Sequence, residues 1–131
     1  MKLEDLKIYQ MAIELGENVW GVVDQWNYFQ KDTIGKQVVR SADSVAANIS
    51  EGYGRYHYKD AKKFHYYSRG SLYETRTWLT KASNRGLIDK KGYEELMKNI
   101  DTLGKMLNAY IKTIGNNQLN DPREPYNTDN D

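Results

Sequence analysis

Apolar residues recur at helical spacing in four stretches of the chain, which short polar or glycine-containing segments separate. The stretches cover about residues 4–28, 32–53, 59–84 and 89–114. Residues three and four apart lie on the same face of an α-helix, so each stretch predicts an amphipathic helix. Both prolines, Pro122 and Pro125, follow the last stretch, where they interrupt none of the predicted helices.

Local signals mark several ends of these helices. Asp and Thr side chains accept hydrogen bonds from the free amides of a first helical turn, and glycine favours the end of a helix. The expected caps are Asp32 or Thr33 before the second helix and Asp89 before the fourth; the expected ends are Gly52 with Gly54, and Asn84-Arg85-Gly86. The connections between the helices are therefore short.

Short connections between long helices place neighbouring helices antiparallel. The sequence therefore predicts an all-α fold, an antiparallel up-down-up-down four-helix bundle, over residues 1–115. A chain of 131 residues has the size of one domain. Residues 116–131 have no periodicity and are rich in asparagine and acidic residues, so they predict a polar acidic tail, disordered or loosely docked.

The apolar stripes predict which helix faces are buried. A parallel stripe of small hydroxyl groups on the second helix, which includes Ser41 and Ser44, would let a neighbouring helix approach closely. The predicted inner stripes are Ile34, Val38, Ala42, Val45, Ile49 and Tyr53 in the second helix; Phe64, Ser68, Ser71, Thr75, Trp78 and Ala82 in the third; and Tyr93, Leu96, Ile100, Leu103, Leu107, Ile111 and Ile114 in the fourth.

The first helix is apolar on two sides. One side carries residues such as Leu6, Ile13 and Trp20, and nearly opposite lies a second apolar set. A helix packed in a monomeric bundle needs a stripe only somewhat wider than 100°. We interpret the second set as a subunit interface; the alternative is a central helix that its own chain covers. The interface set is Ile8, Met11, Leu15, Val22 and Trp26.

The composition excludes several kinds of chemistry. The chain has no cysteine, which removes disulfides, thiolate catalysis and Cys-based zinc sites. Its two histidines, His57 and His65, do not follow a glutamate by three residues, as the usual di-iron site of helical bundles requires. We interpret them as solvent or interface histidines. With no phosphate-binding loop or nucleophile elbow either, we expect no cofactor, no metal and no enzyme activity.

The ends of the chain and its charge bear on location and partners. Glu4 and Asp5 stand where a signal peptide needs an unbroken apolar stretch, and no apolar run reaches membrane-spanning length, so we expect a cytoplasmic protein. The formal net charge is only +1, with a basic middle between two acidic ends. This net positive charge is smaller than that of a dedicated nucleic-acid binder, although a local basic patch can still act electrostatically.

One long motif resembles a known family. It consists of Gln37, Arg40, Ser41, Ala42, Ser44, Val45, Ala47, Asn48, Ile49, Glu51, Gly52, Tyr53, Gly54 and Arg55, followed by Phe64, Gly70, Ser71, Leu72 and Glu74. Together with the opening at Asp5 to Ala12, it is similar to the bacterial four helix bundle proteins, first noticed as products of intervening sequences in large-subunit ribosomal RNA genes. The resemblance covers about residues 3–115.

The resemblance implies an antiparallel bundle that assembles into a ring-like homopentamer, with no enzyme activity. Relatives in that family include the accessory protein of diversity-generating retroelements, a basic protein that binds nucleic acid and a reverse transcriptase. Two features depart from the family pattern. Ala46 replaces a frequent proline, which predicts a less kinked second helix, and the near-neutral charge lacks the strong basicity of the retroelement relatives.

The family motif residues are expected to be structural. We expect Asn48 and Glu51 to form hydrogen bonds across to Ser71 or to the free amides at the start of the third helix, because buried polar groups must be paired. A loss of these partners predicts a cost of about 1–3 kcal/mol for Asn48→Ala. The motif residues interpreted in this way are Arg40, Asn48, Glu51, Gly52, Ser71 and Glu74.

A basic aromatic patch is the densest mixture of rings and cations in the chain. Stacking on rings and cationic contacts to phosphates suit single-stranded nucleic acid. The patch consists of Arg55, Tyr56, Tyr58, Lys59, Lys62, Lys63, Tyr66 and Arg69. The alternative is that the tyrosines pack in the helix turn or at a subunit interface while the lysines keep the exterior soluble.

Two functional hypotheses follow from the sequence. The first is a non-catalytic oligomeric scaffold that binds a protein partner. The second is an accessory protein that binds RNA or single-stranded DNA through the basic aromatic patch. The two-sided first helix supports oligomerisation under either hypothesis, so only the patch discriminates between them.

Overall fold

The computed structural model describes residues 1–117, and within them all secondary structure is helical. Four long helices make up the fold, as the sequence predicts. The elements in order are the 3-10 helix η1 (Leu3–Asp5), α1 (Lys7–Val23), the short α2 (Tyr28–Gln30), the π-helical turn η2 (Lys31–Gly35), α3 (Lys36–Tyr53), α4 (Tyr58–Asn84) and α5 (Lys90–Asn117). Apart from its first two residues, the predicted tail 116–131 lies outside the described residues.

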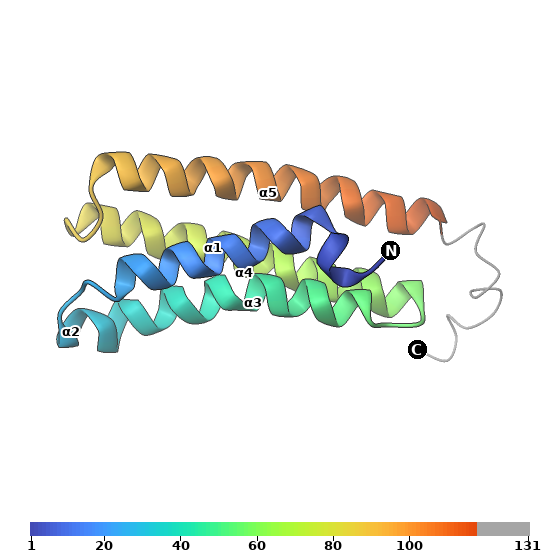
Figure 1. Ribbon diagram of the computed structural model, residues 1–131, viewed down its shortest axis with the longest axis horizontal. Helices are drawn as coiled ribbons and strands as arrows, with labels where there is room; N and C mark the ends of the chain where they lie inside the picture. The colour runs from blue at the N-terminus through green and yellow to red at the C-terminus, as the bar shows by residue number, and fades with distance from the viewer. Residues whose placement is uncertain (118–131) are drawn as a thin grey trace.

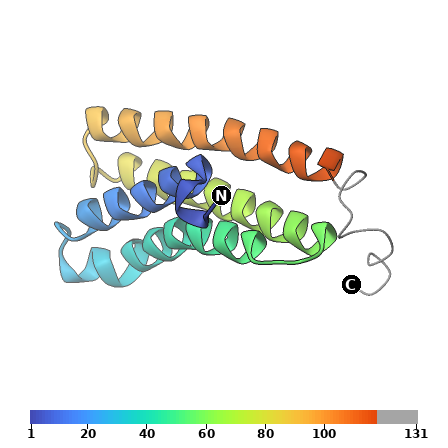
Figure 2. The same cartoon turned by 45° about the vertical axis from the view of Figure 1, so that its right-hand side comes forward.

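The four long helices lie side by side along the long axis of the molecule (Figures 1 and 2). In Figure 1 the chain reaches one end along α1, returns along α3, and repeats this with α4 and α5. α3 packs against α1 and α4, and α5 packs against α4 and α1, with the most extensive contact between α3 and α4. α1 and α4 therefore take diagonal positions in the bundle.

The second long helix begins earlier than the sequence predicts. Asn27, not Asp32 or Thr33, is its N-cap: the Asn27 Oδ1 accepts from the Gln30 backbone N at 2.9 Å, and the Gln30 Oε1 accepts from the Asn27 N at 3.1 Å. This reciprocal pair is a capping box with asparagine and glutamine in place of serine and glutamate. From Tyr28 the chain stays helical through α2, η2 and α3.

Two other predicted helix ends are confirmed. The Asp89 Oδ1 accepts from the Gly92 N at 2.7 Å, as an N-cap does for the third residue of its helix. Gly86 has a φ of 73°, and the Leu87 N donates to the Ala82 O at 2.9 Å across it. This six-to-one bond defines a Schellman motif, in which only glycine takes the left-handed position without strain.

The core contradicts the interface predicted on α1. Ile8, Leu15 and Trp26 are buried within the chain itself, and Met11 and Val22 are half-buried against the same core. The indole Nε1 of Trp26 also donates to the Leu87 O at 3.1 Å. The reason is that α3 and α5 both contact α1 and cover two of its sides. The alternative, a helix covered by its own chain, is therefore correct for this side.

Large apolar side chains are instead exposed on the outer side of α1 and in α2. Trp20 is 60% exposed and Ile13 42%, and Tyr28 and Phe29 are still more accessible. Trp20 lies beside a groove between α1 and α3 that Val23, Val39 and Arg40 help to line. The surface available to a partner is thus the side of α1 that the sequence analysis did not assign to an interface.

Candidate functional site

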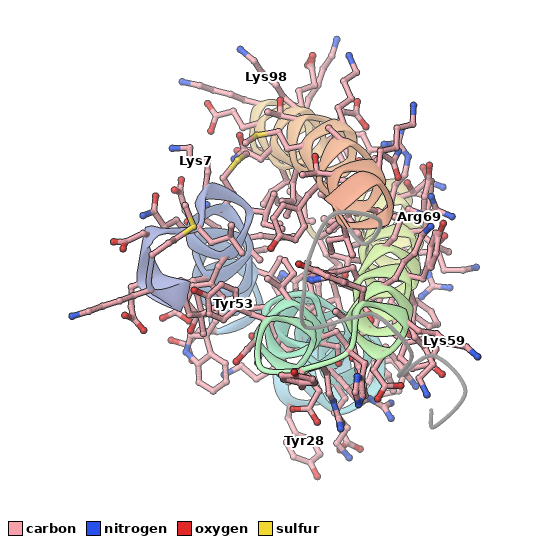
Figure 3. The ribbon with its side chains drawn as sticks, turned by 90° about the vertical axis from the view of Figure 1, so that its right-hand side faces the viewer. Lys7, Tyr28, Tyr53, Lys59, Arg69 and Lys98 are labelled. Carbon is pink, nitrogen blue, oxygen red and sulfur yellow. The ribbon has the colours of Figure 1, made fainter. Side chains whose placement is uncertain are left out.

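The basic aromatic patch forms a surface on the first half of α4 and the turn before it. By helical spacing, Lys59, Lys62, Lys63, Tyr66 and Arg69 share one face of α4. Figure 3 shows Lys59 and Arg69 on the same side of the bundle. Arg55, Tyr56, Lys59, Lys63 and Tyr66 are exposed, whereas Tyr58, Lys62 and Arg69 are half-buried. The structure therefore brings the predicted residues together.

Contacts between rings and cations organise this patch. The Arg55 guanidinium lies 4.6 Å from the centre of the Phe64 ring, and the Arg69 guanidinium lies 4.9 Å from that of Tyr66. The Lys63 ammonium lies 5.7 Å from the Phe64 ring. Such contacts hold cations beside aromatic faces, so the patch presents positive charge and flat apolar surface together.

A groove between α4 and α5 continues the patch and was not predicted. It has a volume of about 430 Å³. The sequence does not reveal this groove, because its two walls are at least 24 residues apart in the chain. Its lining residues are Arg69, Leu72, Tyr73, Arg76, Ile100, Asp101, Gly104, Lys105 and Asn108.

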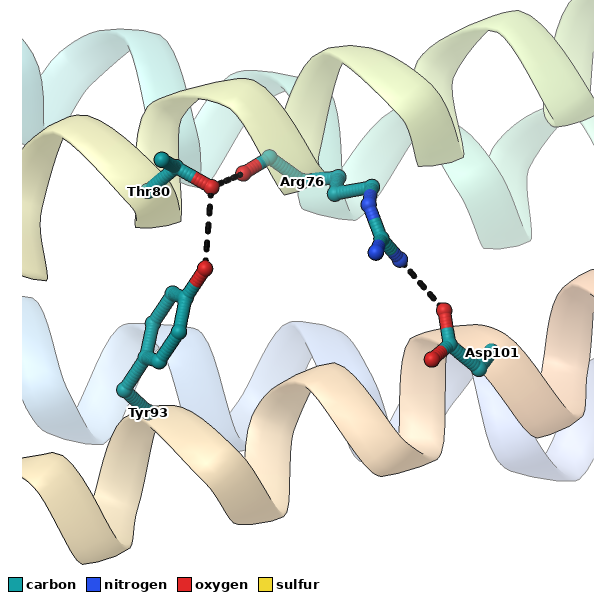
Figure 4. A network of polar contacts seen from close by, with 4 residues as sticks. All are labelled: Arg76, Thr80, Tyr93 and Asp101. Atoms are coloured by element: carbon teal, nitrogen blue, oxygen red, sulfur yellow. Dashed lines mark hydrogen bonds and ion pairs between the residues drawn. The ribbon is translucent and has the colours of Figure 1, made fainter.

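Side-chain contacts fix the spacing of α4 and α5 beside this groove (Figure 4). Arg76 forms an ion pair with Asp101, and the Thr80 Oγ1 lies 3.1 Å from the Tyr93 hydroxyl. The Thr80 hydroxyl donates its one proton to the Arg76 O at 2.9 Å, so Tyr93 donates to Thr80. At the other end of the groove, Arg69 donates to the Asn108 Oδ1 at 3.0 Å. Both walls are therefore held in place before anything binds.

His65 is a core residue, which corrects its interpretation as a solvent or interface histidine. Its side chain is 1% exposed, and neither ring nitrogen has a hydrogen-bond partner among the described residues. The ring meets that of Tyr110 edge to face, with 5.0 Å between centroids. Burial lowers the pKa of His65 to about 4, because a charged imidazolium would lose its hydration there. His65 is therefore neutral near pH 7.

Gly52 makes room for this histidine. A Cβ at Gly52 would lie 2.9 Å from the His65 Nε2 and 3.0 Å from the Ala61 O. Gly52 lies inside α3, whereas Gly54 caps its end with a negative φ. The predicted role of Gly52 as a helix stop is therefore incomplete, since the residue also permits close packing of α3 on α4.

The polar seam between α3 and α4 uses hydroxyl groups rather than the predicted Asn48 and Glu51. The Thr75 Oγ1 lies 2.9 Å from the Ser41 Oγ, and the Ser68 Oγ donates to the Val45 O at 2.8 Å. These three side chains are buried. Small hydroxyls that bond to backbone and to each other need little space, so the two helices approach closely.

The other motif residues bond within their own helices or to the turn that follows α3. The Asn48 Nδ2 donates to the Ser44 O at 2.9 Å, so the expected contact with Ser71 or the start of α4 does not form. Glu51 pairs with Arg55 at 2.9 Å, and Arg40 donates to the Gln37 Oε1 at 2.8 Å. On α4, the Ser71 O accepts from Thr75 and the Glu74 Oε2 accepts from Trp78. These contacts stabilise single helices and do not cross the seam.

Asn48→Ala is now expected to cost less than about 1 kcal/mol. The Ser44 carbonyl is an acceptor of the helix backbone, so removing the amide leaves no buried group without a partner. Thermal unfolding followed by circular dichroism measures the change. A loss of about 3 kcal/mol would contradict this expectation. Ser68→Ala is the comparison, because it removes a buried bond between helices and should cost more.

The described residues hold neither a candidate metal cluster nor a candidate membrane-spanning helix. Residues 1–117 contain no group of three or more histidine, aspartate or glutamate side chains that could hold a metal ion. Within the same part of the chain, no helix combines the length and the apolar character that crossing a bilayer requires. The candidate functional features are thus the basic aromatic patch, the α4–α5 groove and the exposed apolar side of α1.

By its fold, the protein belongs to the class of all-helical proteins with four long packed helices. The family model for the 23S rRNA-intervening sequence protein matches residues 4–109, so the chain belongs to this family. A solved structure with a similar fold is a protein of unknown function from the S23 ribosomal protein family of Bacteroides thetaiotaomicron. It has 21% sequence identity and a TM-score of 0.73, over 80% of this chain and 98% of that chain. No curated protein sequence matches the chain.

These comparisons confirm the family resemblance read from the second and third helices. Neither the family description nor that of the solved structure names a catalytic activity. At this level of identity the solved structure supports the fold alone.

Proposed function

We propose that this protein is a non-catalytic helical scaffold, an antiparallel bundle that assembles with copies of itself and presents a surface to a protein partner. The observation that supports assembly is the exposure of Trp20, together with Ile13, on the outer side of α1. Large apolar side chains grouped on a surface mark interaction sites more often than isolated ones do. Five subunits in a ring is the number that the family resemblance implies.

The physical reason for assembly is the apolar area that these side chains leave in water. Burial of apolar surface contributes roughly 25 cal/mol per Å². Tyr28 and Phe29, on the next helical turn after α1, add further exposed rings. Tryptophan and tyrosine are enriched among the residues that carry most of the binding energy in interfaces. A partner that covers Trp20 would therefore gain affinity from few contacts.

Size-exclusion chromatography coupled to light scattering tests the assembly. At tens of micromolar, the full chain is expected to run as a multimer, with five subunits as the number implied by the family. Dilution should shift the mass downwards only at much lower concentration. A monomer over the whole concentration range would contradict the proposed function.

A second candidate function is the binding of single-stranded nucleic acid by the basic aromatic patch. The observation that favours it is that Lys59, Lys63 and Tyr66 are exposed on one face of α4 beside the ring-bound guanidinium of Arg69. Cations that follow phosphates and rings that stack on bases occur together in such sites. Repetition of the patch in an oligomer would strengthen weak contacts through multivalency.

Fluorescence anisotropy with labelled single-stranded RNA and DNA at two salt concentrations tests this candidate. Binding is expected to weaken at the higher salt, and Lys62→Glu/Lys63→Glu should reduce it at least tenfold, because each phosphate contact releases counterions. Lys90→Glu/Lys91→Glu is the matched control, since these exposed lysines begin α5 away from the patch. Undetectable binding at low salt would end this candidate.

A further inference from the structure

The exposed side of α1 carries three residues in one line. Ile13, Glu17 and Trp20 are spaced by four and three residues within α1, so they project from the same face. All three are exposed, and the line spans about 10 Å at 1.5 Å per residue. We name these three residues the α1 ridge. It combines a large ring, an aliphatic side chain and one carboxylate between them.

The α4–α5 groove has the complementary properties. Its floor is apolar, because Leu72 and Ile100 are buried. Gly104 adds no side chain over this floor, and a Cβ there would meet only the Leu72 Cδ2, at 3.6 Å. A volume of about 430 Å³ lies within the range of sites that enclose small molecules, so a single indole ring fits.

The rim of the groove is cationic and aromatic. Arg69, Arg76 and Lys105 supply three positive charges against the one carboxylate of Asp101. Tyr73, which is 62% exposed, stands among them. Arginine beside a tryptophan ring gives a favourable cation–π contact, and a positive rim attracts a carboxylate such as that of Glu17. The groove therefore offers contacts that match each part of the α1 ridge.

We propose that the α1 ridge of one subunit docks into the α4–α5 groove of the next, with Trp20 over the apolar floor and Glu17 at the cationic rim. This inference rests on the proposed self-assembly and names the two surfaces that carry it. A second copy of this chain is the occupant because the ridge and the groove match in size, apolar character and sign of charge.

The positions of the two surfaces determine the kind of assembly. α1 and Arg69, at the groove, lie on opposite sides of the bundle in the view along its axis (Figure 3). One subunit therefore uses its ridge and its groove for two different neighbours. A head-to-tail contact of this kind closes into a ring when its rotation permits, whereas a self-complementary contact stops at a dimer.

Two variants separate the surfaces. Trp20→Glu removes the ridge, and Tyr73→Glu/Lys105→Glu blocks the groove; all three side chains are exposed, so the fold should be retained. Each variant alone is expected to lose the multimer and run as a monomer in light scattering. The matched controls are Tyr67→Glu, an aromatic residue of α4 that is 52% exposed and lies outside the ridge and the groove, and Lys98→Glu, a lysine of α5 outside the groove. Both should keep the wild-type mass.

Mixing the two variants gives the decisive result. The Trp20→Glu chain keeps an intact groove and the groove variant keeps an intact ridge, so an equimolar mixture is expected to form a one-to-one dimer that cannot grow. Each chain should show the wild-type circular dichroism spectrum. A mixture that stays monomeric would overturn the docking of ridge on groove.

The remaining outcomes are distinguishable. A monomeric wild-type chain overturns the proposed scaffold and this inference together. A multimeric wild type whose ridge and groove variants stay multimeric overturns only this inference, because assembly then uses other surfaces. A groove variant that keeps the multimer but loses binding of single-stranded RNA also overturns it, since the groove then belongs to the nucleic-acid surface.

Discussion

Acidification from about pH 7 to about pH 4 is expected to lower the free energy of unfolding by about 3 kcal/mol through His65 alone. In the folded state burial holds the pKa of His65 at about 4, against an ordinary value of 6.5. Between these two values the unfolded chain takes up a proton that the folded chain does not. Stability is therefore lost as the pH falls through this window. Well above pH 6.5 the histidine is neutral in both states and contributes no pH dependence.

Urea unfolding measured at several pH values tests this expectation. In His65→Leu the imidazole is gone, so the loss of stability between pH 6.5 and 4 should shrink by about 3 kcal/mol relative to the wild type. The chain has only two histidines, which makes His57→Leu the matched control. That variant should keep the pH-dependent loss, because His65 remains buried.

The three proteins are compared by how much the free energy of unfolding changes with pH, and not by its value at one pH. His65→Leu changes packing against Tyr110, so its absolute stability shifts in any case. Acidic groups that titrate in the same range are common to all three proteins and cancel in the difference. If His65→Leu and the wild type lose stability in parallel, the histidine is charged or hydrated in the folded state.

Gly52→Val is expected to destabilise the fold by about 3 kcal/mol, at the upper end of the usual cost of overpacking. Even a Cβ at this position would lie 2.9 Å from the His65 Nε2 and 3.0 Å from the backbone O of Ala61. The carbonyl belongs to α4 and cannot rotate away. Valine adds two methyl groups to this contact, so α3 and α4 would have to separate along their polar seam.

Gly70→Val is the matched control for this substitution. Gly70 lies in the middle of α4, and a Cβ there has nothing within 4 Å. Valine and glycine differ by only a few tenths of a kcal/mol in intrinsic helix propensity, so a change within about 0.5 kcal/mol is expected. Thermal unfolding of both variants measures the contrast. Equal effects of the two substitutions would show that the close approach at Gly52 does not limit the packing.

Local signals predicted the helices well because they depend on neighbours in the chain. Asp89 and the Asn84-Arg85-Gly86 signal act through hydrogen bonds within a few residues, and the structure confirms both. The predicted start at Asp32 or Thr33 was wrong, although the true signal is also local. Asn27 and Gln30 form a capping box in which asparagine takes the place of the usual serine or threonine.

The buried faces were predicted less well, because a periodic pattern does not say which side of a helix meets the bundle. On α4 the predicted stripe contained Ser68, Thr75 and Ala82, which are buried, but also Phe64 and Trp78, which are half-buried. His65, Leu72 and Leu79 complete the real stripe. The three-and-four spacing of His65 with Ser68 and Leu72 was the signal that could have placed this histidine in the core.

The basic aromatic patch could be predicted because most of it lies on successive turns of one helix. The α4–α5 groove could not, since Arg69 and Lys105 meet only after two helices pack. The hydrogen-bond partners of the motif residues were also predicted wrongly. The Asn48 amide donates to the Ser44 O four residues away, so it needs no partner on a second helix.

The sequence by itself determined four amphipathic helices, several of their ends and the family, because helix propensity, capping and apolar spacing act over a few residues. The tertiary structure decided which apolar side of α1 became core, how closely Gly52 let α3 approach α4, and where the groove opened. These depend on which surfaces of distant segments meet. Once α3 and α5 cover Ile8 and Leu15, Ile13 and Trp20 are the large apolar side chains of α1 that remain exposed to water.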